Sequence, residues 1–341
     1  MTAVIPAGVE TARDLVGPAM ATAVARLSPD VRQVAEYHLG LAGTGKPGPG
    51  GKPGGSGKAL RPALALLSAR AASEPAEGGV PAAVAVEMVH NFSLLHDDIM
   101  DGDTERRHRP TAWTVYGTGA AILAGDALLA LAQEILLEAG APNGLWAARC
   151  LSAAVQRLIA GQGADLAFEQ RDDVTLAECQ EMAGDKTAAL MACACSIGAI
   201  HVGAPAALAM GLAGFGAHVG QAFQLTDDLL GIWGAPERTG KPAGSDLRAR
   251  KKSLPIVAAL TSGTAAAGEL AGLLASPEPM DDAQVARAAR LVADAGGRSW
   301  TEAEAAAQLA AARKCLAETD MPEDVRAEFA GIAEFITERQ W

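Results

Sequence analysis

Three aspartates at the end of an apolar stretch have the spacing for metal chemistry. Asp97, Asp98 and Asp101 follow a run that contains Phe92 and Leu95. In a helix, Asp97 and Asp101 are four residues apart and share one face. Like charges at that spacing repel, and carboxylates beside apolar side chains are costly to bury. A cation removes both penalties, and such oxygen ligands favour Mg²⁺, which keeps waters and accepts phosphate oxygens.

The three aspartates alone also fit a solvated acidic helix end. Arg106, Arg107 and Arg109 follow closely, and this context favours metal-bridged diphosphate binding. The planar fork of a guanidinium matches phosphate oxygens. A surface network of ion pairs is the alternative interpretation of the same residues.

A second acidic cluster lies on another apolar segment. Gln224 and Asp227 are three residues apart and share a helix face, and Asp228 follows beside them. Position 231 is glycine, so the carboxylate four residues after Asp227 is missing. One Asp-Asp pair is weak evidence, but two pairs on separate apolar helices favour a single metal cluster.

Cationic residues complete a candidate polyphosphate site. Each of them, taken singly, fits a solvated surface residue. Beside two acidic clusters they become candidate ligands for diphosphate groups. They are Lys58, Arg61, Lys186, Lys241 and Lys251.

Helical periodicity dominates the chain and predicts an all-α, many-helix bundle in one domain, residues 1–341. No alternating strand pattern and no internal repeat occurs. The segment Gly43–Gly57 is rich in Gly, Pro, Lys and Ser, which predicts a mobile loop: a hinge, a lid or an inert linker. The helices are expected at about 8–40 with a break near Ser28-Pro29, from Ala59, from Pro81, at about 118–139, 143–168, 174–202 and 205–232, and in pieces from Leu254.

Composition excludes several classes of function. The net charge of −12 argues against general nucleic-acid binding and against attraction to an anionic membrane. Five cysteines without a CxxC pair argue against disulfides and zinc, and predict a cytoplasmic location. No signal peptide is recognisable. The apolar run Gly119–Leu137 contains Asp126, Gln133 and Glu134, so we interpret it as a buried core helix rather than a membrane span.

These segments resemble the trans-type polyprenyl diphosphate synthases, from about Gly57 to Pro255. His96–Asp101, followed by Arg106-Arg107 and Pro110-Thr111, is similar to the family's first aspartate-rich motif. Gly57–Pro62 is similar to its GGKxxRP segment, with Ser56 in place of one glycine. Further matches follow in the family's order: His90, Gly161-Gln162 with Asp165, Lys186-Thr187, Phe223-Gln224, Asp227-Asp228, Gly240-Lys241, and Asp246-Leu247 through Lys251.

The resemblance implies an isoprenoid synthase fold around a central cavity, a homodimer and three Mg²⁺ ions. It implies that Asp97 and Asp101 bind two ions and that Asp227 binds the third, supported by Asp98 and Asp228. The family's second motif usually reads DDxxD, and here its last aspartate is Gly231.

The resemblance also implies two diphosphate substrates and no protein base, since the departing diphosphate takes the proton. Lys186 counts among the catalytic residues with the five aspartates, and His96 is expected to be structural. The ligands implied for the allylic diphosphate are Arg106, Lys186, Thr187, Gln224, Lys241 and Lys251, and those for isopentenyl diphosphate are Lys58, Arg61, His90 and Arg107.

Product length is expected to depend on residues on the N-terminal side of Asp97. In the family, a bulky residue at the Phe92 position with a small neighbour such as Ser93 resembles enzymes that stop near C20, with C15 second. Two rival functions remain. A class I terpene cyclase lacks support because its usual partner motif is missing, and a non-catalytic subunit of a larger synthase is supported only by Gly231.

Overall fold

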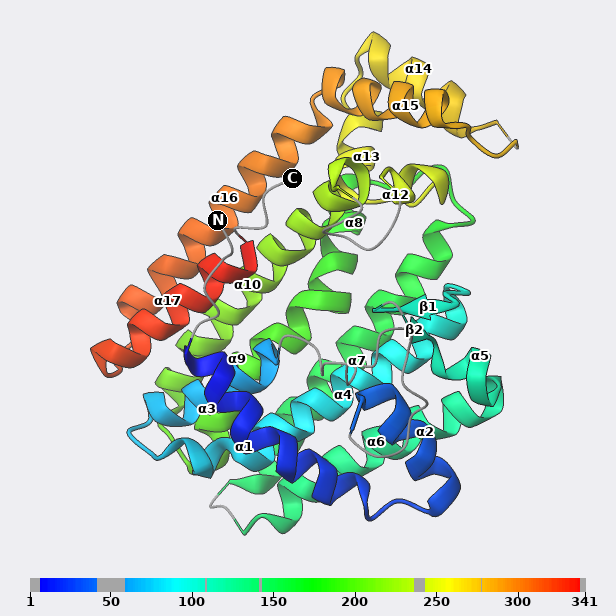
Figure 1. Cartoon of the computed structure of the whole chain (residues 1–341). Coiled ribbons are helices and arrows are strands. Elements are labelled where there is room, and N and C mark those ends of the chain that lie inside the picture. Colours follow the sequence, from blue (N-terminus) through cyan, green and yellow to red (C-terminus); the bar gives the residue numbers. More distant parts are fainter. Residues whose placement is uncertain are drawn as a thin grey trace. The chain divides into compact units, whose positions relative to one another are not determined.

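The computed structural model describes residues 7–41, 59–107, 109–140, 143–235, 243–276 and 278–337. The predicted mobile loop 43–57 lies outside the described residues, as do Lys58 and Lys241. The described chain is helical apart from one small hairpin, so the all-α prediction is confirmed (Figure 1).

The helices of the first half begin and end close to the predicted breaks. Ser28-Pro29 separates the first two helices, with proline at the start of the second. The elements are α1 (Ala7–Val24), α2 (Pro29–Leu39), α3 (Leu60–Ala71), the 3₁₀ turn η1 (Ala76–Gly79), α4 (Val80–Met100), β1 (Glu105–Arg106), β2 (Arg109–Pro110), α5 (Ala112–Tyr116) and α6 (Thr118–Glu138).

The second half continues as helices, and Pro205 lies directly before one of them. Its elements are α7 (Gly144–Phe168), α8 (Leu176–Ala183), the π-helical turn η2 (Gly184–Ala188), α9 (Ala189–Val202), α10 (Ala206–Trp233), α12 (Ser245–Arg248), α13 (Leu254–Leu260), α14 (Ala265–Leu274), α15 (Asp282–Asp294), α16 (Gly297–Glu318) and α17 (Glu323–Thr337).

The chain divides into two compact units, each assembled from separate stretches of sequence. The first contains residues 1–153, 193–213 and 318–332, and the second contains 154–192, 214–317 and 333–341. The first acidic cluster belongs to the first unit and the second cluster to the second. The prediction of one domain stays a prediction.

In the first unit, α4 packs between α3 and α6. Its buried residues include Val84, Met88, Phe92 and Leu95, which recur at three- and four-residue steps. After α4 the chain forms a two-stranded antiparallel hairpin, in which Glu105 pairs with Pro110. These strands are two residues long, which is too short for an alternating pattern to show in the sequence.

The interpretation of Gly119–Leu137 as a buried core helix is only half right. α6 buries Ala124, Leu128 and Leu131, but Leu123 and Leu137 are 60% and 56% exposed. By length and composition alone, α6 and α10 would pass as membrane spans, a test that core helices also pass. The exposed leucines leave one side of α6 apolar within this unit.

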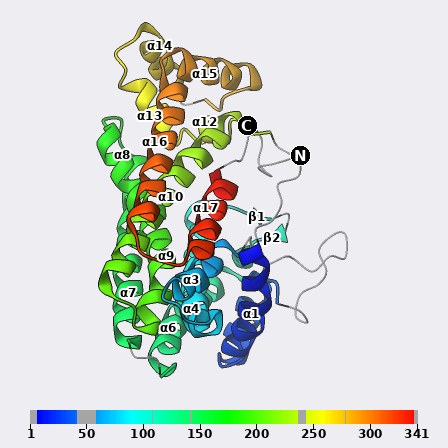
Figure 2. The ribbon, with the colours of Figure 1, turned by 90° about the vertical axis from the view of Figure 1, so that its left-hand side faces the viewer.

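In the second unit, α10 packs closely on the π turn, and small residues permit this. A Cβ added to Gly161 on α7 would collide with the backbone nitrogen of Lys186, and one at Gly220 would collide with Ala188. Leu225, Leu254 and Cys179 share a buried core, which joins α10, α13 and α8. α14 lies along α15 in both views (Figures 1 and 2).

Candidate active site

The last turn of α4 presents the first acidic cluster. Asp101 caps the helix end, and its backbone N–H donates to the Asp97 carbonyl at 2.8 Å. The Asp101 side chain is exposed, Asp97 is half-buried, and Asp98 is only 1% exposed. The cluster therefore has two accessible carboxylates and one that faces inward.

A guanidinium holds the inward carboxylate. Arg106 Nε donates to Asp98 Oδ1 at 2.7 Å, while Asp98 Oδ2 is buried and accepts no hydrogen bond from the residues that the structure describes. Burial raises the pKa of the Asp98 carboxyl, and Arg106 acts in the opposite sense. Arg106, an expected diphosphate ligand, is therefore also the hydrogen-bonding partner of Asp98.

Two of the expected isopentenyl diphosphate ligands, Arg61 and His90, contact each other in this unit. Arg61 Nη1 lies 3.4 Å from His90 Nε2, and Arg61 Nε is buried with no partner among the described residues. Burial lowers the pKa of the Arg61 guanidinium. Burial and the nearby charges of Arg61 and Arg107 hold the pKa of His90 well below its usual range. The neutral imidazole can therefore donate a hydrogen bond to an anion without carrying charge.

The structure adds residues that sequence reasoning missed. Glu87 accepts from Asn91 Nδ2 at 3.2 Å, and its carboxylate acts on Arg61 and Arg107. Burial raises its pKa, and the arginines lower it. Glu87 and Asn91 lie one helical turn apart, with His90 between them on the same side of α4, and this spacing is the signal that the sequence offered.

His38 comes from α2, far away in sequence. It hydrogen-bonds with Asn91, and burial followed by Arg106 and Arg107 lowers its pKa to about 3. A small cavity lies beside it, lined by residues of α2, Asp98 and the arginine hairpin. Arg109 stacks on the Tyr37 ring at 4.5 Å, and the Tyr37 hydroxyl donates to the Pro110 carbonyl at 2.8 Å, which fixes α2 against the hairpin.

Phe92 and His96 lie on the same α4 helix. The Phe92 ring is 6% exposed and packs edge-on against His96, with 4.8 Å between ring centroids. His96 Nε2 lies 3.1 Å from the Ile122 carbonyl oxygen of α6, in keeping with the structural place expected for it. Ser93 is buried, and its hydroxyl donates to the His90 carbonyl at 2.9 Å.

In the second unit, a chain of hydrogen bonds holds the second acidic cluster. Thr187 Oγ1 donates to Gln224 Oε1 at 2.6 Å, and Gln224 Nε2 donates to Asp228 Oδ1 at 2.8 Å. The backbone N–H of Leu254 donates to Asp228 Oδ2 at 2.9 Å. Burial raises the pKa of Asp228 to about 7, against the lowering effect of Lys251. Asp227, its neighbour, is exposed.

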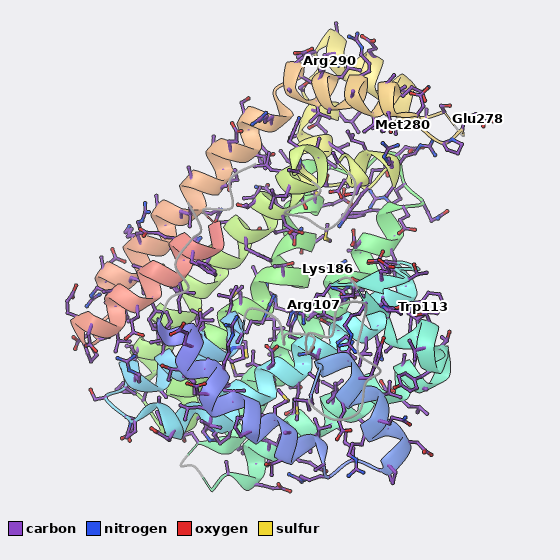
Figure 3. The ribbon with its side chains drawn as sticks, in the orientation of Figure 1. Arg107, Trp113, Lys186, Glu278, Met280 and Arg290 are labelled. Carbon is purple, nitrogen blue, oxygen red and sulfur yellow. The ribbon has the colours of Figure 1, made fainter. Side chains whose placement is uncertain are left out.

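Lys186 lies on the π turn and pairs with a carboxylate. Its Nζ is 2.5 Å from Asp165 Oδ2 on α7. Lys186 and Arg107 are both labelled in Figure 3. Arg107 lies between β1 and β2, where its φ is +53°. π-Helical turns occur frequently at functional sites, and periodicity alone did not predict this one.

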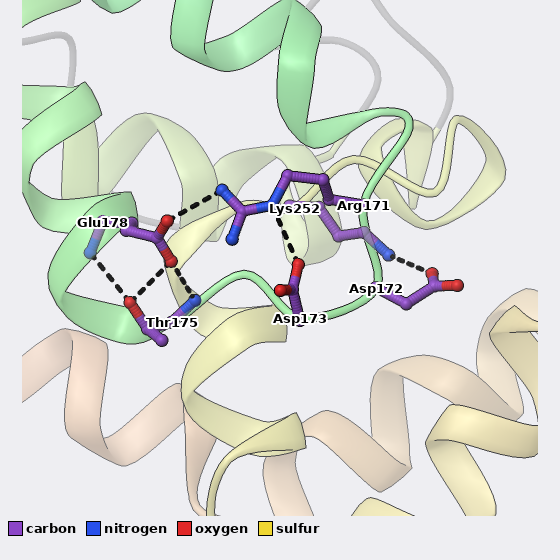
Figure 4. Close-up of polar contacts among 6 residues, drawn as sticks. All are labelled: Arg171, Asp172, Asp173, Thr175, Glu178 and Lys252. Carbon is purple, nitrogen blue, oxygen red and sulfur yellow. Dashed lines mark hydrogen bonds and ion pairs between the residues drawn. The ribbon is translucent and has the colours of Figure 1, made fainter.

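Two adjacent lysines have different surroundings. Lys252 Nζ pairs with the exposed Asp172 at 3.4 Å, beside the capping box of Thr175 and Glu178 (Figure 4). Around Lys251, burial lowers the ammonium pKa, but four carboxylates outweigh it and hold that pKa above its usual value. They are Asp165, Asp228, Asp246 and Asp227.

The carboxylates of the two clusters have the chemistry to bind Mg²⁺ together with a phosphate group. Within the described residues, no three carboxylate, histidine or cysteine side chains gather closely enough to hold a metal alone. Mg²⁺ in phosphate sites takes one or two carboxylates and completes its shell with water and phosphate oxygens. The accessible Asp97, Asp101 and Asp227, and the unpartnered Asp98 Oδ2, fit that role.

The helical fold and these residues fit a prenyl transferase of the isoprenoid synthase type. A family model described as Polyprenyl synthetase matches residues 53–292. The chain is 45% identical to the (2E,6E)-farnesyl diphosphate synthase of Mycobacterium tuberculosis over 333 residues, which covers 96% of this chain and 92% of that one. It is 43% identical to the geranylgeranyl diphosphate synthase of the same organism over 291 residues, covering 84% and 82%.

A solved structure agrees with these relatives. The polyprenyl synthetase from Streptomyces coelicolor A3(2) is 49% identical and superimposes with a TM-score of 0.91, covering 98% of this chain and 99% of that one. The chain belongs to the polyprenyl synthetase family, as its motifs predicted, and it is a short-chain prenyl diphosphate synthase.

Proposed function

We propose that this synthase uses Mg²⁺ to condense isopentenyl diphosphate with an allylic diphosphate, and that its main product is all-trans C20 geranylgeranyl diphosphate. The observation that carries the proposal is the pair of Arg61 and His90, in the same unit as the first acidic cluster. A terpene cyclase binds one diphosphate and needs no second basic group of this kind.

Asp97 and Asp101 would hold two Mg²⁺ ions and Asp227 the third, with Asp98 and Asp228 in support. When bound, the metal neutralises charge on the leaving diphosphate. The further ligands of the allylic diphosphate would be Arg106, Lys186, Thr187, Gln224, Lys241 and Lys251.

Isopentenyl diphosphate would be held by Lys58, Arg61, His90 and Arg107. Glu87 and Asn91 keep this group in place, because Glu87 offsets the charge of the arginines. The allylic C–O bond breaks, and the double bond of isopentenyl diphosphate forms a C–C bond with the allylic cation. The departing diphosphate takes the proton lost from the new chain, and holding the reactants in line removes much of the entropic barrier.

The length proposal rests on Phe92, and C15 is the alternative that the farnesyl diphosphate synthase relative favours. The ring is fixed by its edge contact with His96, so it can form a rigid floor for a growing apolar chain. We expect Phe92→Ala to lengthen the products by at least one C5 unit, measured by mass spectrometry after dephosphorylation. Unchanged product lengths would contradict this assignment.

We further propose that the protein is a cytoplasmic homodimer. Support comes from an apolar surface in the first unit, where Leu123, Leu137, Leu145 and Trp146 are each more than half exposed. Light scattering coupled to size exclusion tests the dimer directly.

The assay for the whole proposal combines purified protein, Mg²⁺, isopentenyl diphosphate and one primer at a time, of C5, C10 or C15. The expected product is a linear C20 diphosphate that appears only with isopentenyl diphosphate and disappears with a chelator. A cyclic hydrocarbon formed without isopentenyl diphosphate would overturn the proposal, and so would the lack of any product from the purified chain.

A further inference from the structure

The hairpin of β1 and β2 carries a strained residue. Arg106 pairs with Arg109 across the two strands, and Arg107 directly follows β1 with a φ of +53°. Left-handed backbone is unfavourable for a residue with a side chain, and it persists only where the surrounding structure holds it. The two strands are each two residues long, and so short a hairpin is not stable by itself. Contacts from other elements must therefore hold Arg107 in this conformation.

Tyr37, near the end of α2, contacts both residues of β2. Its hydroxyl donates to the Pro110 carbonyl at 2.8 Å, and the Arg109 guanidinium lies over its ring, 4.5 Å from the centroid. The Tyr116 ring of α5 meets the Tyr37 ring edge-on, with 5.3 Å between centroids. Tyr37 is thus held between α5 and the hairpin, and it binds the second strand through both backbone and side chain.

A different set of hydrogen bonds closes the base of the hairpin. The Thr111 hydroxyl and the Trp113 indole N–H both donate to the Asp103 carbonyl, at 2.9 Å and 2.8 Å. The Thr111 N–H donates to the Thr104 carbonyl at 3.0 Å. These bonds fix where the hairpin leaves α4 and enters α5, whereas Tyr37 acts on β2, nearer to Arg107.

Arg106 and Arg107 depend on the hairpin to different degrees. Arg106 Nε donates to the buried Asp98 of α4 at 2.7 Å, so a contact outside the hairpin fixes this side chain. The Arg107 side chain is exposed and forms no hydrogen bond or ion pair with the residues that the structure describes. Its position therefore follows the backbone of the hairpin.

We propose that Tyr37 is a positioning residue for isopentenyl diphosphate, which acts by holding the hairpin so that Arg107 meets the diphosphate group. This inference rests on the proposed function, in which Arg107 is a ligand of that substrate. Loss of the Tyr37 contacts should weaken the binding of isopentenyl diphosphate. The allylic diphosphate should be affected much less, because its ligand Arg106 is anchored to Asp98.

The experiment measures the KM of isopentenyl diphosphate and the KM of a C10 allylic diphosphate, each with the other substrate saturating. Tyr37→Leu removes both the ring and the hydroxyl. It should raise the KM of isopentenyl diphosphate about tenfold, and that of the allylic diphosphate less than about twofold. Tyr37→Phe keeps the ring beneath Arg109 and loses only the hydrogen bond to Pro110, so it should raise the KM of isopentenyl diphosphate about threefold.

Tyr116→Phe is the matched control. It keeps the edge contact with Tyr37 and removes a hydroxyl that forms no hydrogen bond within the described part of the chain. Its KM values should equal those of the wild type. Circular dichroism and thermal unfolding midpoints check the folding of each variant, and Tyr37→Phe, which differs from the wild type by one oxygen, gives the answer if Tyr37→Leu does not fold.

The inference is overturned if neither Tyr37 variant raises the KM of isopentenyl diphosphate by more than about twofold. It is also overturned if the KM values of both substrates rise equally, because equal losses indicate a general loosening of the site. Failure of the proposed function looks different. In that case the wild type itself forms no prenyl product from the two substrates.

Discussion

The two acidic regions look alike in sequence, but the structure stabilises them differently. In the first, the buried Asp98 is paired with a cation, since Arg106 donates to it at 2.7 Å. In the second, the buried Asp228 accepts hydrogen bonds from two neutral donors, the Gln224 amide and the Leu254 N–H. Two similar Asp-Asp pairs therefore have different electrostatic environments, which depend on the neighbouring side chains and not on the pair itself.

The difference extends to the neighbours of each pair. The first cluster has Asp101 four residues after Asp97, whereas the second has Gly231 at the matching position and the carboxylate of Asp246 lying against it. The residues beside the two aspartate pairs therefore differ in chemistry and in the segment from which they come. Four predictions test this contrast.

The largest effect is expected at the proposed metal ligands. Asp97→Asn and Asp227→Asn should each lower kcat by about 10³-fold. Each substitution removes a proposed ligand of the Mg²⁺ ions, whose charge neutralises the leaving diphosphate. Steady-state assays of diphosphate release measure this. Asp30→Asn and Asp172→Asn, which remove exposed carboxylates in each unit, should stay within about twofold; a modest effect of Asp227→Asn alone would mean that the second cluster is not a metal site.

A smaller effect is expected on the free energy of unfolding when the buried aspartates lose their hydrogen-bond donors. The donor is charged in the first region and neutral in the second. Arg106→Gln leaves a buried charge without its partner and should lower the free energy of unfolding by about 3 kcal/mol. Gln224→Ala removes a neutral donor and should cost about 1 kcal/mol. Urea unfolding of the metal-free protein gives both values, and equal losses would show that the two regions are held in the same way.

The third prediction concerns acid stability in the first unit. Burial and the arginines lower the folded-state pKa of His38 to about 3, so the unfolded chain takes up the proton first as the pH falls below about 6.5. Stability from this group is complete above pH 6.5 and is lost as the pH falls towards 3. His38→Asn should flatten that part of the pH profile, with His218→Asn as a histidine control; an unchanged slope would show that His38 is not buried beside the arginines.

The smallest effect is expected at Glu178, in the first turn of α8. Hydrogen bonds, from the Arg171 side chain first and then from Thr175, lower the pKa of Glu178 to about 2. Its contribution to stability is present above pH 4.5 and is lost as the pH falls through 2. Glu178→Gln should remove that small acid-dependent loss, and Glu169→Gln should not. Thermal unfolding midpoints of both variants, measured between pH 2 and pH 5, test this difference.

Much of the fold could be predicted from the sequence, because the apolar residues of a helix recur at a short, regular spacing and proline marks helix starts nearby. Pro81 and Ser28-Pro29 marked helix starts, and the apolar steps of α4 marked its buried face. The hairpin after α4 was missed because its strands are two residues long, and the π turn at Lys186 because it differs from an α-helix by one residue per turn.

The candidate site was predicted where a short motif or a resemblance to the family pointed to its residues. His90 and Arg61 were named on resemblance, and the structure brings them together at 3.4 Å. His38 was missed because it reaches Asn91 from α2, and Asp246 was not assigned a role because its contact with Gly231 joins two elements. Contacts between elements are set by packing, which no local pattern encodes.

The central claim is that each of the two acidic regions binds Mg²⁺ when diphosphate is present. The most direct test is the stoichiometry of Mn²⁺, a spectroscopic substitute for Mg²⁺, measured by electron paramagnetic resonance with and without inorganic diphosphate. We predict about three ions per chain only when diphosphate is present, fewer in both Asp97→Asn and Asp227→Asn, and the full number in Asp172→Asn. A stoichiometry that does not depend on diphosphate, or that Asp227→Asn leaves unchanged, would contradict the account.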